Sequence, residues 1–135
     1  MEVKSLSVPG CFLLTPVPER DVRGSFVKTV HAPMFAQYGL RYDFREQYYS
    51  VSHCNVLRGM HFQTPPHDHE KLVYCLAGRA LDVILDLRNG SPWFGRAVSV
   101  VLDASDPAGI YVARGCAHGF LSLVSDTILL YHVTA

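Results

Sequence analysis

The sequence predicts an all-β fold, an antiparallel β-sandwich or jelly-roll barrel with at most one or two short helices. Short runs rich in aliphatic, β-branched and aromatic residues recur at regular spacing along the 135-residue chain, as is typical of strands. Turn-forming segments of Pro, Gly, Asn and Asp separate these runs, and each is too short to link two domains. We therefore expect one domain, residues 1–135.

Two strands, a helix and a longer series of strands are expected in chain order. The first strands are Phe12–Thr15 and Ser25–Val30. A short helix should follow over Ala32–Tyr38, because Pro33 suits a first helical turn and Gly39 a C-terminal stop. The remaining expected strands are Phe44–Ser52, Leu72–Leu76, Ala80–Leu87, Ala97–Leu102, Gly109–Val112, Phe120–Val124 and Thr127–Val133.

The segment Leu81–Leu87 alternates with a period of two. This places Asp82, Ile84 and Asp86 on one face of a strand and apolar side chains on the other. The polar face lines a barrel mouth or faces water, and the pattern alone does not choose between these two arrangements.

Composition excludes several function classes. Twelve Lys and Arg balance twelve Asp and Glu, so the chain lacks the overall positive field of a nucleic-acid binder, and any anion must be held locally. No apolar run approaches the length of a membrane span or a signal peptide. The spacing of Cys11, Cys54, Cys75 and Cys116 matches neither a zinc knuckle nor a disulfide framework, which predicts reduced thiols and a cytoplasmic protein.

The seven histidines raise the question of a metal site. His67-x-His69 followed later by Gly115-x-x-His118 is similar to the pattern of metal-binding cupins. That pattern also has an acid at a fixed distance before a glycine, and the position counted back from Gly78 holds Lys71. Because a lysine would repel a cation, and because the His67–His69 segment reads as an exposed turn, we expect no metal.

Six sequence blocks follow one another in an order that spans nearly the whole chain. They are Asp21-x-Arg23-Gly24-x-Phe26, Val56–Gln63, Lys71–Val73, Asp82–Arg88, Ser91–Gly95 and Gly115–Phe120. With these blocks the chain resembles the dTDP-4-dehydrorhamnose 3,5-epimerase family, metal-free cupins that act on nucleotide-linked 4-keto-6-deoxy sugars. The resemblance implies a cupin-type fold and an epimerase that inverts C3, C5 or both.

The resemblance also implies catalytic roles for three residues. His61 matches the base that takes a proton next to the ketone, and an imidazole suits this task because its pKa lies near working pH. Lys71 matches the position where positive charge stabilises the enolate oxygen. Tyr131 matches the acid that returns a proton to the opposite face, and no cofactor is required. The competing structural roles are a core histidine, a strand-end lysine and a sheet aromatic.

Further residues match substrate-binding positions of the family. Arg23 and Arg58 match positions that grip the diphosphate, for which the guanidinium fork is well suited. His118 matches a position that contacts substrate. Three more positions are expected in or near the pocket, namely Gln63, Glu46 and Lys28. Tyr48 and Tyr49 could stack on a base or pack in the core.

Several positions depart from the family pattern. Lys28 stands where members commonly have an acid, and Glu46 where they more often have a neutral amide, so the bound sugar or nucleotide is expected to differ. Ala113 and Cys116 replace residues expected to pack the turn before His118.

The largest departure concerns the partner of the base. Family members continue beyond the position of Ala135 and supply an aspartate that holds the basic histidine. Three explanations stay open: Asp82 or Asp86 holds His61, the enzyme inverts one centre, or the chain only binds. Retention of both the base and the acid favours a working epimerase.

Other functions fit parts of the same pattern. A 3,4-ketoisomerase on the same substrate class would give a different product by NMR, a metal-dependent cupin would contain metal by elemental analysis, and a non-catalytic sugar-nucleotide binder would show no isotope exchange. The resemblance also implies a homodimer in which the strand Phe44–Ser52 or the N-terminal strands extend a partner's sheet.

Overall fold

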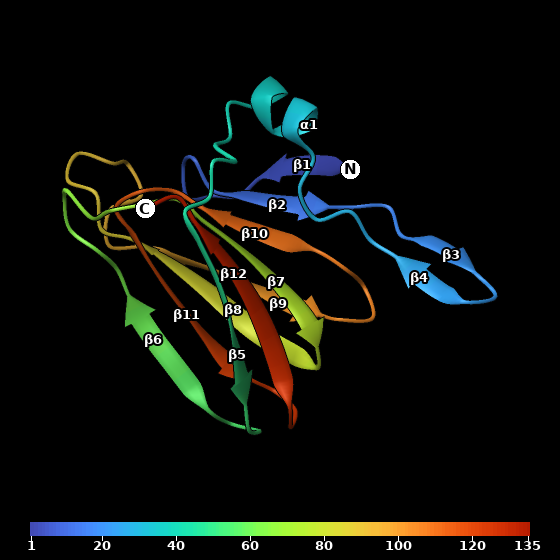
Figure 1. The fold of residues 1–135 in the computed structure, drawn as a ribbon. Helices are drawn as coiled ribbons and strands as arrows, with labels where there is room; N and C mark the ends of the chain where they lie inside the picture. The colour runs from blue at the N-terminus through green and yellow to red at the C-terminus, as the bar shows by residue number, and fades with distance from the viewer.

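The computed structural model describes residues 1–135 as a sandwich of two antiparallel sheets (Figure 1). The larger sheet has the strand order β1-β2-β10-β7-β12-β5 and the smaller sheet the order β6-β11-β8-β9. The strands of the larger sheet are β1 (Glu2–Ser5), β2 (Phe12–Thr15), β10 (Gly109–Val112), β7 (Lys71–Ala77), β12 (Thr127–Val133) and β5 (Glu46–Ser52). Those of the smaller sheet are β6 (Leu57–His61), β11 (Cys116–Ser122), β8 (Arg79–Asp86) and β9 (Ala97–Asp103).

Two elements lie outside the sandwich. The hairpin of β3 (Glu19–Asp21) and β4 (Gly24–Phe26) projects away from the body of the molecule, and all of its strand residues are exposed (Figure 1). The helix α1 (Ala32–Gln37) lies beside β1 and β2 and buries Phe35 (Figure 1). It is not long and apolar enough to cross a membrane.

Apolar side chains form a core on each side of the larger sheet. The first core lies between the two sheets and includes Val73, Ile84, Phe120 and Leu129. The second core lies under α1 and comprises Leu14, Phe35, Leu40, Leu72, Tyr74 and Tyr111. Successive strand residues point to opposite faces, so Leu72 and Val73 of β7 enter different cores. The first core holds the two sheets together behind the site described below.

The predicted fold class is confirmed, and most predicted elements are present. The strands Phe12–Thr15, Gly109–Val112 and Thr127–Val133 have the predicted bounds, and the helix ends one residue earlier than predicted. The expected strand Ser25–Val30 is wrong in extent, because only Gly24–Phe26 pairs in the exposed hairpin. The strands β1, β3 and β6 were not expected, because most of their side chains are exposed and show no apolar alternation.

Candidate active site

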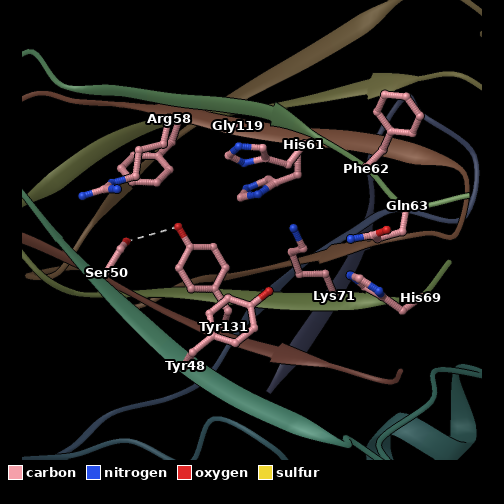
Figure 2. A pocket seen from close by; sticks show the side chains of 12 residues that line it. Tyr48, Ser50, Arg58, His61, Phe62, Gln63, His69, Lys71, Gly119 and Tyr131 are labelled. Carbon is pink, nitrogen blue, oxygen red and sulfur yellow. Dashed lines mark hydrogen bonds between the residues drawn. The ribbon is translucent and has the colours of Figure 1, made fainter. Parts of the chain in front are cut away.

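A hollow of about 370 Å³ lies between the two sheets, close to their edge strands β5 and β6. Side chains of both sheets point into it (Figure 2). The lining consists of Tyr48, Ser50, Arg58, His61, Phe62, Gln63, His69, Lys71, His118, Gly119, Phe120 and Tyr131. The structure therefore brings together His61, Lys71 and Tyr131, which lie far apart in the sequence.

The smaller sheet supplies two imidazoles to the hollow. His61 at the end of β6 is paired in register with His118 of β11, so the two residues are cross-strand neighbours. A pair of glycines allows the strands to approach here. A Cβ atom on Gly59, whose φ is +108°, would lie 2.8 Å from the Gly119 Cα, and one on Gly119 would lie 2.8 Å from the Arg58 carbonyl oxygen. The glycines in two of the family blocks thus have a steric role beside the site.

A carboxylate holds the second of these imidazoles. The Nε2 atom of His118 lies 2.7 Å from Oδ2 of Asp82, and both side chains are almost fully buried. This corrects the expectation that Asp82 orients His61, because Asp82 and His118 are diagonal neighbours on the paired strands β8 and β11, with Asp82 opposite Phe120 and His118 opposite Ile84. His61 is exposed and makes no hydrogen bond to a carboxylate of this chain. Such a partner fixes the tautomer and orientation of an imidazole, so His118 is the rigid imidazole of the pair.

The expectation that Asp86 holds His61 is wrong as well. Asp86 accepts hydrogen bonds from Arg88 (Nε to Oδ1, 3.0 Å) and from the hydroxyl of Ser91. Burial alone would raise the pKa of Asp86, but the hydrogen bonds from Arg88 and Ser91 outweigh it and lower the pKa to about 2. Asp82 and Asp86 do share the buried face of β8, so the alternating segment points its polar side chains inward.

The larger sheet supplies two phenols to the opposite side of the hollow. Tyr131 of β12 is paired in register with Tyr48 of β5, and their rings stack with centroids 5.1 Å apart. The Tyr131 hydroxyl lies 3.2 Å from Oγ of Ser50 (Figure 2). Burial raises the pKa of Tyr131 to about 12, so its hydroxyl keeps its proton at neutral pH and is available as a donor.

Lys71, the first residue of β7, extends into the hollow between these walls (Figure 2). Its Nζ atom lies 5.8 Å from the centroid of the Tyr131 ring, and it forms no salt bridge. Burial lowers the pKa of Lys71, and the charge of Asp82 opposes this effect. An ammonium without a bound carboxylate is free to interact with an oxygen of a ligand.

Only one of the two expected diphosphate-binding arginines lies at the hollow. Arg58 lines it, and its Nε atom donates to Oγ of Ser52 at 2.9 Å. Arg23 lies on the β3–β4 hairpin, is highly exposed and pairs with Asp21. Lys28 lies near the hairpin at a separate hollow. In one chain, therefore, neither Arg23 nor Lys28 reaches the site, because the hairpin projects away from it (Figure 1).

A second hollow of about 300 Å³ shares Tyr48, Gln63 and His69 with the first. Glu46 lines this second hollow, whereas Gln63 lines both. The expectation that the His67–His69 segment is only an exposed turn is wrong for His69. Its Nδ1 atom lies 3.1 Å from the His67 carbonyl oxygen, and the ring borders the first hollow beside Lys71 (Figure 2).

Several lining residues had no assigned role in the sequence prediction. Ser50, Phe62 and His69 have no site role in the sequence prediction, and Tyr48 is expected either to stack on a base or to pack in the core. The alternation of β5 could have placed Tyr48 and Ser50 on one face, but only the pairing with β12 shows which side chain they meet.

Two antiparallel sheets that enclose imidazoles, an ammonium and phenols in one hollow define a cupin-like protein with an acid–base site. The chain belongs to the dTDP-4-dehydrorhamnose 3,5-epimerase family, whose model matches residues 5–135.

Comparison with similar proteins supports this family assignment. A dTDP-4-dehydrorhamnose 3,5-epimerase of Mycobacterium tuberculosis is 41% identical over 136 residues, which cover 100% of this chain and 67% of the relative. Its solved counterpart, the rmlC epimerase, has a TM-score of 0.95 and 41% identity over 100% of this chain and 68% of that one. NovW, a 4-keto-6-deoxy sugar epimerase of Streptomyces spheroides, has a TM-score of 0.96 at 32% identity, with coverage of 100% and 68%. The chain thus spans about two thirds of the length of these relatives.

Proposed function

We propose that this protein is an epimerase that acts on a nucleotide-linked 4-keto-6-deoxy sugar and inverts C3, C5 or both. The observation that carries the proposal is the placement of His61 and Tyr131 on opposite sheets around one hollow, with Lys71 between them (Figure 2). Inversion needs a base on one face of the sugar and an acid on the other. The two walls of the hollow offer these groups.

The reaction follows from these positions. His61 removes the proton from a carbon next to the ketone, and the electron pair of that C–H bond moves to the carbonyl oxygen. The Lys71 ammonium stabilises the resulting enolate. The carbonyl then re-forms as Tyr131 delivers the proton of its hydroxyl to the opposite face of the same carbon. His61 gives up its extra proton to water, and the Tyr131 phenolate takes one back.

The supporting residues fit this assignment. The buried Asp82–His118 pair places a fixed imidazole beside His61, where its other ring nitrogen can accept a hydrogen bond from a sugar hydroxyl. The choice of substrate class is supported by NovW, described as a 4-keto-6-deoxy sugar epimerase, and by the 3'-monoepimerase ChmJ of Streptomyces bikiniensis in complex with dTDP-quinovose. Arg58 at the hollow would bind the diphosphate, with Gln63 and Glu46 farther along toward the second hollow.

We further propose that the protein is a homodimer. The β3–β4 hairpin holds Arg23 away from the hollow of its own chain, with a side chain that is 87% exposed and paired only with Asp21. In a dimer Arg23 can reach the partner's hollow and complete the diphosphate site. A mixture of Arg23→Ala and His61→Ala subunits should then regain activity, because each mixed dimer contains one intact site. No recovery in a proven mixed dimer would contradict the arrangement.

The free state of all four cysteines supports a cytoplasmic location.

The test of the catalytic proposal is isotope exchange. The protein is incubated in D₂O with a dTDP-linked 4-keto-6-deoxyglucose, and NMR follows deuterium and configuration at C3 and C5. We expect exchange and inversion in the unmodified protein and a loss of about 10²-fold or more in His61→Ala. His53→Ala is the matched control, because His53 lies exposed outside the hollow.

The outcomes separate the competing functions. Binding of the sugar nucleotide without deuterium exchange would indicate a non-catalytic binder, and a 3-keto product would indicate a ketoisomerase. Deuterium exchange that persists unchanged in His61→Ala would show that His61 is not the base.

A further inference from the structure

The wall that carries Tyr131 presents a second phenol to the hollow. Tyr48 stacks on Tyr131 with an interplanar angle of 27°, and both side chains line the hollow. The two rings differ in exposure: Tyr131 is 8% exposed, whereas Tyr48 is 43% exposed. Tyr48 is therefore open to both ligand and water, and the proposed mechanism leaves it without a role.

The two hydroxyl groups serve different parts of the hollow. The Tyr131 hydroxyl is directed toward Ser50, on the side of Arg58, whereas the Tyr48 hydroxyl is directed toward the side of Lys71 (Figure 2). The stacked rings and the strand register fix these directions, because Tyr48 and Tyr131 are paired residues of β5 and β12. The wall thus carries two proton donors that point to different parts of the hollow.

The chemistry of the substrate class has a matching requirement. In a 4-keto sugar, C3 and C5 flank the carbonyl, and both carry protons that the carbonyl acidifies. A proton donor must come within about 3 Å of the carbon it serves. A hydroxyl placed over one of these carbons lies farther from the other, so two donors can serve inversion at both carbons.

Resting on the proposed epimerase function, we propose that Tyr48 is a second catalytic acid, which protonates one of the carbons flanking the ketone while Tyr131 protonates the other. In this step the Tyr48 O–H bond breaks and a C–H bond forms from the enolate electron pair as the carbonyl is restored. Water then returns a proton to the phenolate, and the exposure of Tyr48 makes this possible.

The protonation state of Tyr48 is consistent with this role. Burial, followed by the nearby charge of Glu46, raises the pKa of the Tyr48 hydroxyl. The phenol therefore holds its proton at neutral pH and becomes available as a donor. The competing structural role is that Tyr48 only supports the ring of Tyr131 by stacking, which needs the ring but not the hydroxyl.

The experiment removes each hydroxyl and measures exchange and inversion separately at C3 and C5. Tyr48→Phe keeps the ring and its stacking, Tyr131→Phe is the companion variant, and Tyr49→Phe is the control because Tyr49 is an exposed neighbour on β5 outside the hollow. All are tested as full chains in D₂O with the dTDP-linked 4-keto-6-deoxyglucose. Thermal unfolding midpoints verify that the variants remain folded.

We expect Tyr48→Phe to lose about 10²-fold in inversion at one carbon, and Tyr131→Phe to lose it at the other. Exchange with retained configuration should continue at the affected carbon, because His61 still removes a proton and returns deuterium to the same face. Unchanged inversion at both carbons in Tyr48→Phe would overturn the proposal, as would an equal loss at both. Inversion of a single carbon by the unmodified protein would overturn it too. If the unmodified protein shows no exchange at all, the proposed function itself fails.

Discussion

Replacement of Lys71 by Met should change activity and stability in opposite directions. Lys71 is partly buried at the start of β7, and it has no carboxylate partner of its own because Asp82 is bound to His118. Removing one stabiliser of a developing oxyanion costs about 10²–10³ in rate, or roughly 3–4 kcal/mol. Removing a poorly solvated charge in favour of an apolar chain of similar length should stabilise the fold by about 1 kcal/mol.

The stability effect has a defined pH dependence. Burial lowers the pKa of Lys71 below its ordinary value of 10.5, so the unfolded chain binds more protons than the folded one in the pH window between the two pKa values. The penalty is therefore fully present below the folded-state pKa and is lost as pH rises toward 10.5. The advantage of Lys71→Met should shrink over that window.

Urea unfolding followed by circular dichroism, together with epimerisation rates, measures both effects. Lys4→Met is the control, because Lys4 is exposed on the edge strand β1, and it should change stability by less than about 0.5 kcal/mol. A Lys71→Met variant that is less stable and retains its rate within a few fold would refute the reasoning, since Lys71 would then be a structural residue.

The other predictions concern three buried residues that do not line the hollow. Asp82→Asn should reduce kcat/KM about 10- to 100-fold and cost about 1.5–3 kcal/mol, because His118 loses a buried charged partner; kinetics and urea unfolding measure the two effects. Asp86→Asn should destabilise the fold by roughly 2 kcal/mol at pH 7. Because the folded pKa of Asp86 is depressed to about 2, this difference should vanish as pH falls from about 4 to 2, and thermal unfolding across that range tests it. Gly109→Ala should cost about 1–3 kcal/mol, since a Cβ atom would lie 2.5 Å from the Tyr74 ring; equal unfolding midpoints would contradict this.

The fold was predictable where strands bury one or both faces. The segment Thr127–Val133 contains the run Ile128–Tyr131 and is mostly buried between β7 and β5 of the larger sheet, so its bounds could be predicted directly. The strand Glu19–Asp21 could not be read in this way, because its three side chains are exposed and only backbone pairing with β4 defines it. The alternation of apolar and polar residues in a sequence reflects burial, so an exposed edge strand shows little of the pattern from which strands are predicted.

The site was predictable to the extent that the family blocks mark its residues. The blocks and the match at Tyr131 indicated His61, Lys71, Arg58 and Tyr131 before any contact was known, and all four line the hollow. The pairing of carboxylates with imidazoles was not predictable, because it depends on which strand lies beside which. Asp82 meets His118 and not His61 since β8 is next to β11, whereas β6 lies on the far side of β11.

The position of the hollow follows from the topology of the two sheets. β5 and β6 are consecutive in the chain, yet each is the edge strand of a different sheet, so their backbones do not pair and the sandwich stays open between them. The proposed base His61 lies on one sheet and the phenols on the other, which gives the proposed reaction its two opposed faces. Phe120 belongs both to the core between the sheets and to the lining of the hollow, so the packing that fixes the sheet separation also fixes the distance across the site. An acid and a base that must act on the same carbon from opposite sides depend on this separation, and a close-packed core holds it more rigidly than a loop could.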